Sequence, residues 1–168
     1  LANISLFAKY QIYKKDAKAK TFRILARIMQ TFPTGKITSK ASIETGLSQT
    51  YIGLVIGQIS TKVGVYTDFG YNITNKAASD NFKYNFSIGL PLLPHKYPRN
   101  QLNTFLEYNG NYVFDSNLHT LFVSPGLQYI HGRRLLFETS FQIPIIQRNI
   151  ATNKTEYMVL LGTRFLIN

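Results

Sequence analysis

The sequence predicts an all-β protein, and three observations support this prediction. Apolar and polar residues alternate along the chain, the alternating segments are long, and helical periodicity is hard to find. The alternation is clearest over residues 101–114, where Leu106 and Tyr108 fall on one face of an extended chain and Glu107 and Asn109 on the other. The 168 residues are expected to belong to a single domain.

Nine segments alternate in this way, and each is expected to form a strand. In chain order they are Ile4–Tyr13, Thr21–Phe32, Gln49–Ser60, Lys62–Asn72, Phe82–Leu92, Gln101–Phe114, Leu118–Ile130, Arg133–Ile146 and Thr155–Ile167. Most have 10 to 14 residues, whereas a soluble strand averages about 5–6 and a tilted membrane-spanning strand about 9–11. Strand length therefore favours a transmembrane sheet over a soluble sandwich.

The fourth, fifth, sixth and eighth segments alternate most clearly, and the others do so more weakly. Outside 101–114, the residues on the apolar faces of the clear segments are Val63, Val65, Thr67, Phe69 and Tyr71; Phe82, Tyr84, Phe86, Ile88, Leu90 and Leu92; and Leu135, Phe137, Phe141, Ile143 and Ile145. Three prolines, Pro91, Pro125 and Pro144, fall inside alternating segments. Because proline lacks a backbone donor, each predicts a bulge or a strand end.

The chemistry of the two faces favours a membrane barrel. The polar faces are rich in Asn, Gln, Ser and Gly with occasional charges, which is typical of a lumen, and the opposite faces suit lipid. The barrel must close, because hydrocarbon does not tolerate open sheet edges, and bacterial barrels normally have an even number of strands. The sequence therefore predicts an antiparallel transmembrane β-barrel in which residues 1–168 supply nine of 10–12 strands and lack at least one N-terminal strand.

Short and long connections are expected to alternate. Tight turns are predicted at Ser60–Thr61 and His131–Gly132, and loops at 33–48, 73–81, 115–117 and 147–154. If the chain ends in the periplasm, the tight turns lie there, together with the longer connections 14–20 and 93–100, and the loops lie outside.

Composition excludes several other classes of protein. The absence of cysteine excludes disulfide frameworks, cysteine zinc sites and thiol catalysis. The longest apolar runs are far shorter than the roughly 20 residues of a spanning helix, and a content of 45% hydrophobic residues excludes disorder. The net charge of +11 raises the alternative of nucleic-acid binding, but the basic residues do not cluster on one face, so nucleic acid is not an expected partner.

Many of the basic residues fall in predicted loops, where they are expected to contact lipid headgroups or the phosphates of lipopolysaccharide. They are Lys14, Lys15, Lys18, Lys20, Lys36, Lys40, Arg99, Arg148 and Lys154.

Charged residues on the polar faces are the candidate functional residues. By alternation the lumen-lining candidates are Lys9, Arg23, Arg27, Asp68, Lys83, Glu107, Arg134, Glu138 and Arg164, to which Lys62 and Glu156 are added. Two interpretations are open: a ladder of charges that sets the selectivity of a pore, or ion pairs that plug and stiffen a narrow barrel. Glu107, Glu138 and Arg134 are the first candidates for a network.

Aromatic residues near strand ends are expected to form interfacial girdles. They are Tyr51, Tyr71, Phe82, Tyr97, Phe114, Tyr129 and Tyr157. Phe7, Phe105 and Phe122 fall on the polar face instead. His95, His119 and His131 share no ligand spacing, so no metal and no cofactor is expected. Asp115-Ser116 near His119 is ordinary turn chemistry, and enzymatic activity is not expected.

Short motifs in a fixed order cover most of the chain. They include Phe7-Ala8-Lys9-Tyr10-Gln11, Pro33-Thr34-Gly35-Lys36, Gly89-Leu90-Pro91-Leu92-Leu93-Pro94-His95, Tyr97-Pro98-Arg99-Asn100, Ser124-Pro125-Gly126-Leu127-Gln128-Tyr129, Phe141-Gln142-Ile143-Pro144 and Leu160-Leu161-Gly162-Thr163-Arg164-Phe165. In these motifs the chain resembles the outer-membrane transporters associated with the meta-cleavage pathway of phenol degradation. The resemblance implies a closed barrel in a Gram-negative outer membrane and passage of hydrophobic or aromatic molecules. One departure is the end Phe165-Leu166-Ile167-Asn168, because such barrels tend to end on an aromatic residue.

We therefore expect an outer-membrane channel or transporter for the passive passage of small solutes, hydrophobic or aromatic ones among them. The alternative is a structural barrel with a plugged lumen that serves as an envelope anchor or as a subunit of a complex. A third hypothesis is a soluble basic β-protein that binds nucleic acid. Such a protein would stay soluble as a monomer without detergent.

Overall fold

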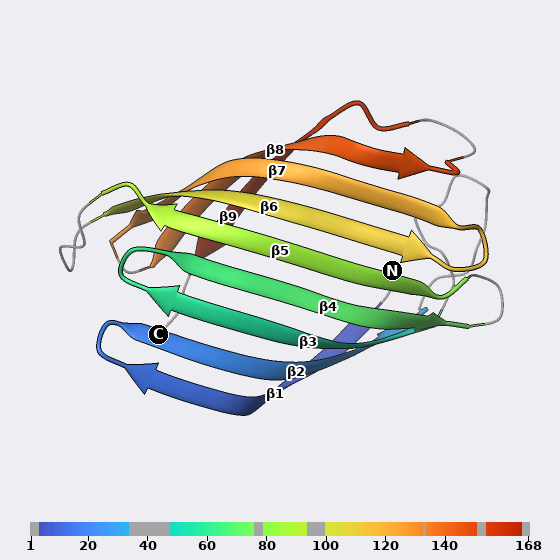
Figure 1. The fold of residues 1–168 in the computed structure, drawn as a ribbon, viewed down its shortest axis with the longest axis horizontal. Helices are drawn as coiled ribbons and strands as arrows, with labels where there is room; N and C mark the ends of the chain where they lie inside the picture. Colours follow the sequence, from blue (N-terminus) through green and yellow to red (C-terminus); the bar gives the residue numbers. More distant parts are fainter. Residues whose placement is uncertain are drawn as a thin grey trace.

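The computed structural model describes residues 4–33, 48–75, 79–93, 100–132, 134–150 and 154–165. These residues form one antiparallel sheet of nine strands, each paired with the next in the chain (Figure 1). The strands are β1 (Ile4–Ala17), β2 (Lys20–Phe32), β3 (Gln49–Ser60), β4 (Gly64–Thr74), β5 (Asn81–Pro91), β6 (Gln101–Val113), β7 (Leu118–His131), β8 (Leu135–Arg148) and β9 (Met158–Phe165). The described part of the chain contains no helix that could cross a membrane.

All nine predicted strands are present, and the bounds of β3 agree with the sequence prediction at both ends. The largest difference is in β1, which continues to Ala17 instead of ending at Tyr13. The reason is an irregularity in the pairing of β1 with β2 between Gln11 and Tyr13, which shifts the alternation by one residue. The expected connection 14–20 is therefore wrong: only Lys18 and Ala19 join the two strands.

The three prolines lie where the ladders are interrupted. Pro91 is the last residue of β5, and Pro144 lies beside the register shift between β7 and β8. Pro125 pairs with β6 but has no partner in β8, where the ladder passes from Val123 to Gly126. The prediction is confirmed at Pro91, which ends β5, and at Pro144, which lies beside the shift. It is wrong at Pro125, which lies within β7 and interrupts the pairing with β8 without changing its register.

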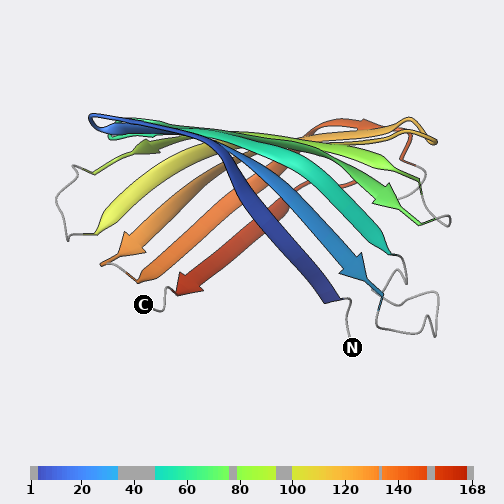
Figure 2. The same cartoon turned by 90° about the horizontal axis from the view of Figure 1, so that it is seen from below.

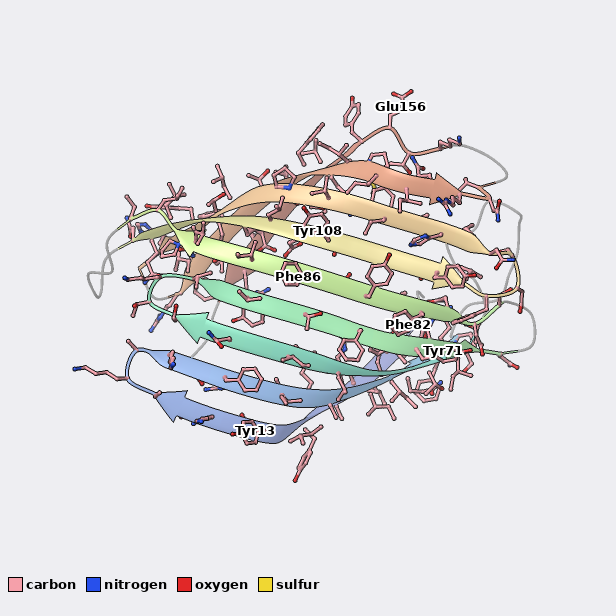
Figure 3. All side chains as sticks on the ribbon, viewed as in Figure 1. Tyr13, Tyr71, Phe82, Phe86, Tyr108 and Glu156 are labelled. Atoms are coloured by element: carbon pink, nitrogen blue, oxygen red, sulfur yellow. The ribbon has the colours of Figure 1, made fainter. Side chains whose placement is uncertain are left out.

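The sheet is strongly curved, and its two faces differ in chemistry. Both end strands, β1 and β9, curl to the same side of the sheet (Figures 1 and 2). The convex face carries apolar side chains, among them Phe86 and Tyr108, which project from the outer side in Figure 3. Because residues directly opposite in neighbouring strands share a face, the register places the charged and amide side chains of β4, β5 and β6 on the concave face.

No second layer of protein covers the apolar face in the described part of the chain, which is a single sheet. Apolar side chains of the convex face are correspondingly exposed, for example Tyr10 at 74% and Leu161 at 81%. Tyr51 is the one large hydrophobic side chain that is fully buried among the described residues, at 3% exposed, and it lies on the concave face. The sheet therefore has no conventional hydrophobic core.

The sheet is not closed within the described residues, because β1 pairs only with β2 and β9 only with β8. Because each of the nine strands runs antiparallel to the next, β1 and β9 run in the same direction. A direct pairing between them would therefore be parallel, and antiparallel closure would require an odd number of intervening strands.

Connections at the two ends of the sheet differ in length. At one end, the connections between β1 and β2, β3 and β4, and β7 and β8 span two or three residues, but residues 92–100 separate β5 from β6. At the opposite end, residues 33–48 separate β2 from β3. The predicted turn at Gly132 is confirmed, and this residue has a φ of 59°. Only glycine adopts that conformation without a steric penalty.

The Gly132→Ala substitution is expected to lower the free energy of unfolding by about 1 kcal/mol, because an L side chain is strained at positive φ. Urea unfolding of protein refolded in detergent micelles measures this change. Gly89→Ala is the matched control, since its added Cβ would meet its nearest atom, Thr104 O, at 3.7 Å in an ordinary contact. Equal stability of the two variants would contradict the strained turn.

Candidate functional site

The concave face brings together most of the charged residues predicted to line a lumen. In one row across the sheet, Lys9 lies opposite Arg27 in the backbone register, and Arg27 lies opposite Gly53. The row continues through Gly70 to Lys83. By register, eight candidates share this face: Lys9, Arg23, Arg27, Asp68, Lys83, Glu107, Glu138 and Arg164. Whether the face lines a solute path stays a prediction.

Arg134 differs from the prediction. It lies in the turn between β7 and β8 and is exposed, because β8 begins one residue later, at Leu135. It forms no ion pair with Glu107 or Glu138 within the described residues. Lys62 likewise lies in the turn between β3 and β4, and Glu156 lies in the connection before β9, where it projects beyond the edge of the sheet (Figure 3). Turns carry no alternation, so extending the strand pattern into them assigned these residues wrongly.

An ion pair between β2 and β4 is the most completely partnered group on the concave face. Arg27 Nη2 lies 3.0 Å from Asp68 Oδ2, and both side chains are half-buried. The Tyr51 hydroxyl donates to Asp68 Oδ1 at 2.8 Å, and the Arg27 guanidinium lies over the Tyr51 ring, 4.6 Å from its centroid. Since Tyr51 belongs to the intervening strand β3, the cluster ties three strands together.

Two glycines allow Tyr51 to lie flat across the sheet. Gly53 and Gly70 are directly opposite each other in β3 and β4. A Cβ on Gly53 would lie 2.6 Å from the Tyr51 hydroxyl oxygen, and a Cβ on Gly70 would lie 2.5 Å from the Tyr51 ring. Any side chain at these positions would displace the ring from Asp68. The prediction that Tyr51 belongs to an interfacial girdle is therefore wrong, and its place on the concave face follows from register.

A cavity of about 500 Å³ lies on the concave face. Its wall runs from Ile59 of β3 to Gly162 of β9, and Glu107 and Glu138 are among the residues that line it. Both are half-buried. Ser87 and Asn109 donate hydrogen bonds to Glu107, and the charge of Glu138 repels it.

Amides and hydroxyls make up much of the remaining concave surface. Asn109 Nδ2 donates to the hydroxyl of Ser124, which is fully buried, and Asn103 Nδ2 donates to Gln128 Oε1 at 3.0 Å. Other buried polar atoms lack a protein partner within the described residues: Arg27 Nε, Thr74 Oγ1, Asn81 Oδ1 and Asn111 Oδ1. A buried amide oxygen without a protein partner requires water or a polar ligand.

The concave aromatics are placed as the alternation predicts: Phe7 pairs with Met29, Phe105 with Gly126, and Phe122 with Asn109. The Phe105 ring lies directly over Gly126. This contact fills the wall between β6 and β7 and leaves the ring at the surface of the cavity.

Aromatic residues of the convex face gather near both ends of the strands. Near the loop end, Tyr71 contacts Phe114, and Tyr112 contacts both Phe114 and His119. At the opposite end, Tyr129 contacts His131, and Asn100 Nδ2 donates a hydrogen bond to the Tyr129 hydroxyl. Phe82 and Tyr157 also make aromatic contacts, with Tyr84 and Phe141, whereas Tyr97 lies outside the described residues. The Tyr84 hydroxyl hydrogen-bonds to His119, a contact that the sequence analysis missed.

The predicted loop cations are placed in several different ways. Lys14 belongs to β1, where it forms an ion pair with Asp16 at 2.6 Å, so its assignment to a loop is wrong. Lys15 also belongs to β1, Lys18 lies in the two-residue turn, Lys20 begins β2 and Arg148 ends β8. Lys36, Lys40, Arg99 and His95 lie outside the described residues. Among the described residues, no cluster of three or more His, Asp or Glu side chains could hold a metal ion.

Comparison with known proteins finds no matching family model, no matching curated protein and no matching solved structure. The resemblance to the phenol-pathway transporters therefore stays a prediction from sequence motifs.

The Tyr51→Phe substitution is expected to lower the free energy of unfolding by about 1–2 kcal/mol, because it removes the hydrogen bond to a half-buried carboxylate but keeps the ring. Tyr10→Phe is the matched control, since Tyr10 is exposed on the convex side, and it should change stability by less than about 0.5 kcal/mol. Urea unfolding measures both variants. A double-mutant cycle with Asp68→Asn should show coupling, and additive effects would contradict the contact.

Proposed function

We propose that the chain forms the greater part of an outer-membrane β-barrel through which small solutes pass passively, hydrophobic or aromatic solutes among them. The observation that carries this proposal is the uncovered apolar convex face of a curved sheet whose polar side chains lie within the curve. A soluble single sheet would bury its apolar face against another layer. Lipid is the partner that suits such a face without a second layer.

A sheet of this kind in lipid would have to close, and the strand directions limit how it could do so. Unpaired edges are not tolerated in hydrocarbon, and an odd number of strands must separate β1 from β9. One or three further strands would complete a barrel of ten or twelve, in agreement with the even strand numbers of bacterial barrels. The connection 33–48 would then lie on the outer side, and the connection 92–100 would lie on the periplasmic side with the short turns. Cations at the strand ends, such as Lys20 and Arg148, would face lipid or lipopolysaccharide headgroups.

A second candidate function is a structural barrel whose lumen is plugged. The observation that favours it is the contact of Arg27, Asp68 and Tyr51 across three strands, because such a group stiffens a wall. Both candidates share the membrane barrel and differ in conductance.

Incorporation of the protein into planar lipid bilayers is expected to produce stable, discrete conductance steps. Glu138→Ala should change their size or ion selectivity, because Glu138 lines the cavity on the concave face. Arg134→Ala is the matched control, since Arg134 lies in the exposed turn beside the same strand. A silent bilayer would favour the plugged barrel and contradict the channel.

The lipid-facing assignment is tested by two adjacent residues on opposite faces. Phe86→Arg, on the convex face in the middle of β5, is expected to lower the free energy of unfolding in lipid vesicles by about 2–4 kcal/mol, the cost of arginine near the bilayer midplane. Asn85→Arg places the same charge on the concave face beside Asp68 and should be tolerated. Equal tolerance of both variants would exclude lipid on the convex face.

A further inference from the structure

Unpaired cations gather on the concave face of the first two strands. Lys9 lies directly opposite Arg27, and Lys14 lies directly opposite Arg23. Like charges in direct cross-strand pairs are destabilising. Each pair has one carboxylate partner: Asp68 pairs with Arg27, and Asp16 pairs with Lys14. Within the described residues, Lys9 and Arg23 therefore have no carboxylate within ion-pair distance.

Unpaired carboxylates occupy another part of the same face. Glu107 of β6 and Glu138 of β8 repel each other and have no ion-pair partner among the described residues. Both line the 500 Å³ cavity. Two further cations lie on the concave face outside the first two strands, Lys83 of β5 and Arg164 of β9, and both are exposed.

One row across the strands connects the two regions. In the backbone register, Arg23 lies opposite Gly57, and Gly57 lies opposite Tyr66. The row then continues through Ser87 to Glu107. The Tyr66 ring lies over Gly57, and Arg23 acts electrostatically on Tyr66. A cation and a carboxylate are thus separated by neutral residues along a curved wall, which gives the space within the curve a positive and a negative side.

We propose that this concave face selects small zwitterionic solutes, which turn a carboxylate toward Arg23 and an ammonium group toward Glu107 and Glu138. The proposal rests on the channel function proposed above. A simple anion is attracted to Arg23 but repelled by both glutamates, and a simple cation is attracted to both glutamates but repelled by Arg23. Only a solute that carries both charges is attracted on both sides. The cavity lies on the negative side: Glu107 and Glu138 line it, and Arg23 does not. It is large enough for the ammonium end of such a molecule and presents Tyr66 and Phe105 to the carbon chain, while Arg23 faces the carboxylate from outside the cavity.

Uptake of four small molecules of equal heavy-atom count into proteoliposomes tests this proposal. The probes are zwitterionic β-alanine, neutral lactamide, anionic lactate and cationic β-alaninamide, each radiolabelled. Wild-type protein is expected to admit β-alanine about two- to fivefold faster than lactamide, the scale of attraction between hydrated charges. The preference should fall at high salt, because screening weakens both attractions.

Two sets of variants separate the positive and negative sides. Arg23→Gln should abolish the β-alanine preference and slow lactate, whereas Glu107→Gln with Glu138→Gln should abolish the same preference and slow β-alaninamide. Arg23→Lys retains the charge and should retain the preference, which separates loss of charge from loss of folding. Lys20→Gln and Glu156→Gln are matched controls at a strand end and in a connection, and should leave the β-alanine to lactamide ratio unchanged.

The outcomes distinguish this proposal from the channel itself. Entry of lactamide with no β-alanine preference, or a preference that survives both sets of variants, would overturn zwitterion selection and leave the channel standing. Exclusion of all four probes would overturn both proposals. A β-alanine preference that each set of variants removes would support zwitterion selection.

Discussion

Cross-strand pairing of the backbone is the constraint on which the rest of this structure depends. Eight antiparallel pairings connect nine strands in chain order, so each residue's neighbours across the sheet are determined by register. A slip of one residue would move every side chain of a strand to the opposite face. The separation of apolar from polar side chains therefore holds only because the register is kept, and the bulges near Gln11 and Pro144 are the places where it shifts.

Side chains on the concave face reinforce that register. Tyr51 lies across Gly53 and Gly70 and reaches Asp68, so a slip between β3 and β4 would bring a bulkier residue beneath its ring. Phe105 over Gly126 acts in the same way between β6 and β7. A sheet without an apolar core thus gains specificity from aromatic rings that lie in glycine gaps and from hydrogen bonds between polar side chains.

Stabilisation of the fold does not by itself explain how charge is distributed on the concave face. The ion pair between Arg27 and Asp68 ties β2 to β4 and has an evident structural role. Lys9 opposite Arg27, and Glu107 near Glu138, are like-charge arrangements that work against folding. Side chains that oppose stability are expected where function requires them, and this contrast separates the wall-stiffening residues from the candidates for solute recognition.

The amino-acid sequence by itself determined the class of fold, the nine strands and the face on which most side chains lie, because alternation with a period of two is a local property of an extended chain. It therefore placed Asp68, Glu107 and Glu138 on the polar face, but it extended the pattern too far at Arg134 and stopped too early at Tyr13, where a turn and a bulge interrupt the period. Only the tertiary structure decided which charges meet, that Tyr51 faces the polar side, and that β1 and β9 curl toward the same side with unpaired edges. Those features depend on register and curvature across strands, which bring together residues far apart in the chain and leave no local pattern to read.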